Sequence, residues 1–113
     1  MNQPTTLVFA GCQHERVRHH LFPGDDREAA AILLCSRSSL PRLRFLVREL
    51  ILIPHDACRV REPDAITWPG MYIEDAIDHS EAENLTILLI HSHPGGLYTF
   101  STCLLYTSDA ADE

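Results

Sequence analysis

The chain has 113 residues, of which 45% are hydrophobic, and a formal net charge of −7. This length supports one small domain with a single core, and the acidic balance argues against nonspecific binding to nucleic acid. No apolar run approaches the roughly 20 residues of a membrane-spanning helix, the first residues lack a signal-peptide pattern, and the four cysteines form no Cys-x-x-Cys motif. These features predict a cytoplasmic protein that binds neither nucleic acid nor a membrane.

The first half of the chain is predicted to alternate between strands and helices. Residues 6–10 indicate a short strand, and residues 13–21 indicate a short helix. The apolar run 29–36 favours a strand, although its three alanines also suit a helix. Residues 42–53 predict a long, half-exposed strand. One face of this strand would carry Leu43, Phe45, Val47, Ile51 and Ile53.

The second half is predicted to contain a helix and a buried strand. Residues 54–63 indicate a loop, and Thr67 is a suitable N-cap for a helix over residues 68–83. Residues 85–90 are apolar on both faces, as is typical of a central strand covered on each side. The inner face of the helix would be formed by Tyr72, Ile73, Ala76, Ile77 and Ser80.

Two histidines follow the predicted central strand, in the order His91, Ser92, His93. Because side chains alternate along a strand, the histidines would point to one side and Ser92 to the other, where it would form a structural hydrogen bond. Two imidazole groups converging on one point would supply two of the three protein ligands of a catalytic zinc. Taken alone, the pair would more simply be exposed at a strand end.

The segment from His91 to Ser101 resembles the JAMM signature of the MPN-plus (JAB-type) metalloproteases. That signature reads His-x-His, seven residues, Ser, two residues and Asp. Glu28, at the edge of an apolar run, stands where the family places a glutamate. The resemblance covers Glu28 to Thr102, and the chain departs from the signature at Leu104, where the family has Asp.

The resemblance implies an α/β fold of the cytidine-deaminase-like JAB/MPN type, a curved mixed sheet flanked by helices that is incomplete at its C-terminus. It implies a Zn²⁺ cofactor held by His91 and His93, with Glu28 as general base and Ser101 stabilising the oxyanion. The reaction would be cleavage after the C-terminal glycine of a ubiquitin-like or sulfur-carrier protein. Bacterial members also suggest a fused or neighbouring ubiquitin-activating-type adenylyltransferase as partner.

Residues 103–113 carry a different signal. Cys103 to Asp112 match the translation of the end of a transposase-based sequencing adapter, and Glu113 fits the unfinished codon. We therefore expect a truncated metalloprotease domain over residues 1–102 and an adapter-derived tail over 103–113; the alternative is a native acidic terminus. Without the third ligand, activity of this chain should be impaired, and an aspartate at position 104 is expected to restore zinc binding.

Other interpretations of these residues stay open. A genuine Leu104 would favour a metal-free scaffold of the MPN type, and the spacing of the histidines also resembles the RadC group of DNA-repair-associated proteins. The acidic balance argues against the latter. Glu28 would otherwise be a surface acid, and Ser101 a turn residue.

Further histidines are interpreted without a catalytic role. His14, His19 and His20 would lie on a solvated helix face, and Trp68 would pack at the start of a helix. The spacing of His55 and Cys58 is typical of metal ligands, but a surface edge is the simpler interpretation.

Overall fold

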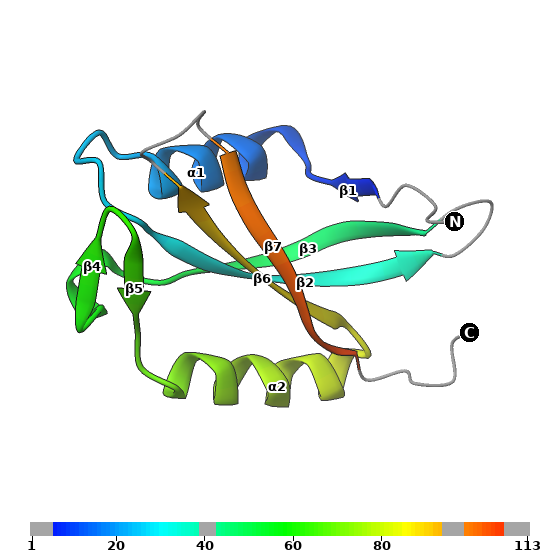
Figure 1. The fold of residues 1–113 in the computed structure, drawn as a ribbon. Helices are drawn as coiled ribbons and strands as arrows, with labels where there is room; N and C mark the ends of the chain where they lie inside the picture. The colour runs from blue at the N-terminus through cyan, green and yellow to red at the C-terminus, as the bar shows by residue number, and fades with distance from the viewer. Residues whose placement is uncertain (1–5, 39–42, 94–98, 108–113) are drawn as a thin grey trace, which may run out of the picture.

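A curled mixed sheet forms the centre of the protein, with one helix on each face (Figure 1). The computed structural model describes the backbone of residues 6–38, 43–93 and 99–107, and the side chains of the first two ranges. The strand order is β1-β3-β2-β6-β7; β1 is parallel to β3 and the other pairs are antiparallel. The predicted α/β class with a curved mixed sheet flanked by helices is confirmed at this level. The elements are β1 (Thr6–Val8), α1 (Gly11–Leu21), β2 (Ala30–Ser38), β3 (Arg44–Leu52), a 3₁₀ turn (His55–Ala57), β4 (Val60–Glu62), β5 (Ala65–Thr67), α2 (Met71–Glu83), β6 (Thr86–His93) and β7 (Thr99–Thr107).

Strand β2 lies in the middle of the sheet and supplies residues to two cores. On one face its alternate residues pack with Val17 and Leu21 of α1, and on the other they pack with Ala76 of α2. Both faces are covered, which explains why the strand is apolar without alternation. The α1 side takes Ala31, Leu33 and Cys35, and the α2 side takes Ala30, Ile32 and Leu34.

Strand β3 contains a bulge that changes which face its residues occupy. Leu34 pairs with Glu49 while Cys35 pairs with Val47, so Arg48 is the extra residue. Phe45 and Val47 therefore pack on the α1 side, whereas Ile51 and Ile53 pack on the α2 side. The prediction that these apolar residues share one face is wrong, because one additional residue shifts the alternation of the strand.

Helix α2 begins later than predicted. Its N-cap is Gly70, and Thr67 does not cap it, because Thr67 pairs with Val60 in a hairpin. The helix ends at a left-handed Asn84, with φ 57°. The described helices include none long and apolar enough to cross a membrane. The predicted inner face is confirmed, since Tyr72, Ile73, Ala76 and Ile77 pack on the sheet and Ser80 is fully buried.

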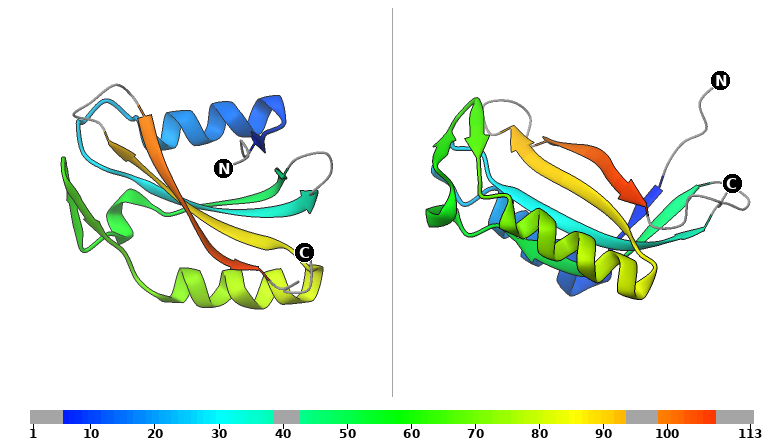
Figure 2. Two further views of the ribbon diagram at one scale, coloured as in Figure 1. Left: turned by 45° about the vertical axis from the view of Figure 1, so that its right-hand side comes forward. Right: turned by 90° about the horizontal axis from the view of Figure 1, so that it is seen from below.

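The segment predicted to be a loop, residues 54–63, contains the 3₁₀ turn and strand β4, which forms a small hairpin with β5. The strands are joined by a two-residue turn, Pro63 and Asp64, a combination that favours turns. Figures 1 and 2 show this hairpin beside the end of the main sheet at which β6 terminates. It forms one wall of the site described next.

Candidate functional site

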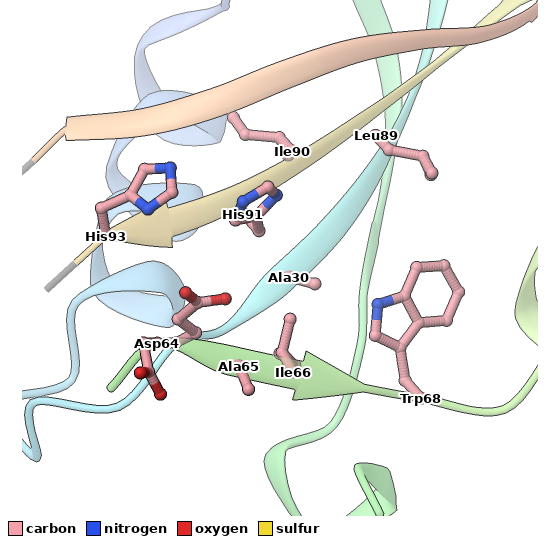
Figure 3. A pocket seen from close by; sticks show the side chains of 10 residues that line it. Ala30, Asp64, Ala65, Ile66, Trp68, Leu89, Ile90, His91 and His93 are labelled. Atoms are coloured by element: carbon pink, nitrogen blue, oxygen red, sulfur yellow. The ribbon is translucent and has the colours of Figure 1, made fainter. Parts of the chain in front are cut away.

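A cavity of about 450 Å³ lies between the hairpin and the end of β6 (Figure 3). Its polar residues come from three separate parts of the chain: the loop before β2, the hairpin turn, and the end of β6. The polar lining consists of Glu28, Asp64, His91 and His93, and the apolar lining of Ala30, Ala65, Ile66, Trp68, Leu89 and Ile90.

The two histidines lie on one side of β6, as the sequence predicts. Their ring centroids are 4.9 Å apart with an interplanar angle of 70°. His91 is half-buried and His93 is exposed. Ser92, between them, is fully buried; its Oγ accepts a hydrogen bond from the Ala29 N–H at 3.0 Å, and its own N–H donates to the Ala29 carbonyl at 3.0 Å. Ser92 thus fastens β6 to the segment that enters β2.

Glu28 reaches the same cavity from the loop before β2. Its backbone N–H donates to the Glu62 carbonyl at 2.9 Å, and the following residue, Ala29, is held by Ser92. Glu28 is only 6% exposed, and among the described residues its carboxylate has neither a hydrogen-bond nor an ion-pair partner. A carboxylate on the wall of a cavity that two imidazoles also line would stabilise a cation there.

Asp64 is a further carboxylate of the cavity that the sequence interpretation did not identify. It occupies the turn of the hairpin, and Figure 3 shows it on the same side of the cavity mouth as His93. The sequence feature that could have indicated this position is the dipeptide Pro63–Asp64, which favours a turn. Trp68, interpreted from the sequence as core packing, packs against the α2-side cluster and also lines the cavity.

The side chains of Ser101 and Leu104 lie outside the described residues, but the backbone of β7 is described. Ser101 pairs with His91, and Leu104 pairs with Leu88. Position 104 is therefore three residue pairs from His91, about 10 Å along the strand. The backbone of position 104 therefore does not lie beside the histidines in this register, which disfavours the expected restoration of zinc binding by an aspartate there.

The donor set matches part of a zinc site. His91 and His93 would supply two nitrogen ligands, but within residues 6–38 and 43–93 no three His, Cys, Asp or Glu side chains are grouped closely enough to hold a metal ion. The described residues therefore fit a two-histidine half-site with a nearby carboxylate, and they do not complete the three-ligand set of a catalytic zinc.

A second pair of histidines lies elsewhere and is structural. The rings of His20 and His55 are stacked with centroids 4.4 Å apart, and their Nε2 atoms contact the carbonyl oxygens of Ala30 and His20 at 3.1 and 3.0 Å. Burial, reinforced by His55, lowers the pKa of His20. The prediction that His20 lies on a solvated face is therefore wrong. Cys58 contacts the Pro54 carbonyl at 3.7 Å, and burial raises the pKa of its thiol.

Comparisons with known proteins add no identification. No protein-family model, curated protein or solved structure matches this chain. The residues of the cavity and the motif they form are therefore the features that indicate a function.

Proposed function

We propose that this chain is the core of a JAMM-type zinc isopeptidase with the cytidine-deaminase-like JAB/MPN fold. The observation that carries the proposal is that Glu28, a residue only 6% exposed, lines the same cavity as His91 and His93. The proposed substrate is a ubiquitin-like or sulfur-carrier protein, cleaved after its C-terminal glycine. The proposed partner is an adenylyltransferase that activates such a protein.

The residues of the cavity have separate tasks in this reaction. When bound, zinc lowers the pKa of a water molecule to about 7 and polarises a carbonyl group. His91 and His93 would hold the ion through their ring nitrogens. Glu28 would accept a proton from the attacking water and return it to the leaving amine.

The apolar half of the cavity fits the same proposal. Ile66 and Trp68 of the hairpin side lie opposite Leu89 of β6, and together they form a wall without charged groups. Such a wall accommodates the backbone of an extended peptide while the polar half acts on the scissile bond. Because the described side chains supply only two of the three zinc ligands, we expect hydrolysis by this chain to be weak or absent.

Zinc affinity tests the proposal directly. Metal-free protein at pH 7.5 would be titrated with Zn²⁺ against a chromophoric chelator. His91→Ala and His93→Ala should each weaken binding at least about tenfold, since even outer-shell changes cost 10- to 100-fold at zinc sites. His19→Ala is the matched control, because His19 is 75% exposed on α1. Equal zinc affinity of the wild type and the His91→Ala/His93→Ala double variant would refute the proposal.

A metal-free binding module is the second candidate. It is favoured by one observation, the absence of a third close ligand among residues 6–38 and 43–93. Zinc content near zero after purification with added Zn²⁺, in a folded protein, would mark this alternative.

A further inference from the structure

An ion pair joins the hairpin to the loop that carries Glu28. Arg61 Nη1 donates to Asp25 Oδ2 at 2.6 Å, and Nη2 donates to Asp25 Oδ1 at 3.1 Å. The Arg27 N–H donates to the same carboxylate at 3.2 Å. A two-point contact between guanidinium and carboxylate fixes the orientation of both groups as well as their distance.

This pair lies next to the hydrogen bond that holds the Glu28 backbone. Glu62 directly follows Arg61 in β4, and its carbonyl accepts the Glu28 N–H at 2.9 Å. Residues 25–28 are therefore attached at both ends to consecutive residues of the hairpin. On the other side of Glu28, Ala29 is attached to Ser92 of β6. Glu28 is held between the two walls of the cavity.

The environment of Arg61 indicates more than a stabilising role. Its side chain is only 7% exposed, and Nε is buried without a hydrogen-bond partner among the described residues. Asp25, the other partner, is exposed, and an ion pair with a solvent-exposed partner contributes little to stability. Its specific effect is orientation, because the planar guanidinium allows one arrangement of hairpin and loop.

We propose that the Asp25–Arg61 pair is a positioning device for Glu28. It keeps the hairpin and the loop together as one unit, so that the Glu28 carboxylate faces the two histidines and Asp64 stays at the cavity. The catalytic meaning of this arrangement rests on the proposed function, in which Glu28 transfers the proton. The mechanical coupling itself is independent of any metal.

Amide hydrogen exchange of the full, metal-free chain, followed by two-dimensional NMR, tests this coupling. In Asp25→Asn, exchange of the Glu28 amide should accelerate at least about tenfold, while exchange of Leu33 in the core of β2 changes less than about twofold. Asp25→Glu, which keeps the charge, should restore slow exchange at Glu28. Asp26→Asn is the matched control, because Asp26 has φ 58°, a conformation that asparagine tolerates.

A second variant removes the other partner. Arg61→Met keeps an apolar stem of similar length and leaves no buried charge unpaired, so it should fold and should show the same local acceleration at Glu28. The proposal is overturned if Glu28 exchange stays slow in both Asp25→Asn and Arg61→Met. It is also overturned if the Glu28 and Leu33 amides accelerate equally, because the pair would then support only the global fold.

The outcome can be separated from that of the zinc experiment. Exchange is measured without metal, so failure to bind zinc would remove the proposed reaction and leave the coupling intact. Zinc binding lost in His91→Ala, together with an unresponsive Glu28 amide in Asp25→Asn, would refute only the positioning role.

Discussion

Replacing Ser92 by alanine should cost the protein much of its stability. The Ser92 hydroxyl is fully buried and accepts the Ala29 N–H at 3.0 Å. Alanine would leave that N–H buried without an acceptor, which costs about 1–3 kcal/mol in free energy of unfolding. In a domain of this size, each kcal/mol corresponds to a Tm change of about 4–8 °C. We therefore expect the Tm of Ser92→Ala to fall by at least about 4 °C.

Ser80→Ala is the matched control for this measurement. Ser80 is also fully buried, but its Oγ donates to the Ile77 carbonyl at 3.0 Å, within helix α2. That carbonyl keeps its helical hydrogen bond after the substitution, and alanine is the better helix former. The free energy of unfolding should therefore change by no more than about 0.5 kcal/mol.

Urea unfolding, followed by the fluorescence of the single tryptophan and by circular dichroism, would measure both variants. The slope of the free energy against urea concentration should match the wild type, so that a change in midpoint reports a change in stability. If Ser92→Ala loses no more stability than Ser80→Ala, the bond between β6 and Ala29 does not hold the site together.

Three further outcomes are expected. Because burial lowers the pKa of His20 below 6.5, the unfolded chain binds a proton at His20 more readily than the folded chain does. The free energy of unfolding should therefore not be reduced by His20 above pH 6.5, and it should decrease as the pH falls below that value. Urea unfolding between pH 8 and 5 measures this, and His20→Gln, which keeps a donor, should flatten the profile. Burial raises the pKa of Cys35 to about 12, so iodoacetamide at pH 8 should label exposed Cys12 and spare Cys35 until unfolding, as peptide mass mapping would show. Leu104→Asp should leave zinc affinity unchanged, because position 104 pairs three residues away from His91; tighter binding would contradict this register.

Strand β6 shows what periodicity alone can predict. Its apolar residues indicated a strand covered on both faces, and Ile87 packs on the α2 side while Leu88 and Ile90 pack on the α1 side. The same alternation predicted the opposite directions of Ser92 and the histidines. Local sequence suffices here because both faces of the strand are fully covered.

The hairpin and the bulge could not be predicted in this way. Each hairpin strand has three residues, too few for a periodic pattern, and its position depends on Arg61 meeting Asp25, which is 36 residues away. The bulge at Arg48 is equally hidden, because residues 50–53 are all apolar and fit either alternation. Asp64 lies at the cavity because the hairpin places it there, and the local sequence around Asp64 predicted only a turn.

The small size of Ala30 explains why the sheet has a hollow beside the histidines. Ala30 pairs with His91 and lines the cavity, whereas Ile32 and Leu34, on the same face of β2, carry branched aliphatic side chains that fill the space under α2. The hollow is thus present because the first residue of β2 has a short side chain that leaves this space unfilled. A cavity in such a fold needs one short side chain at the end of a strand whose other positions are filled, together with the hairpin that forms the opposite wall.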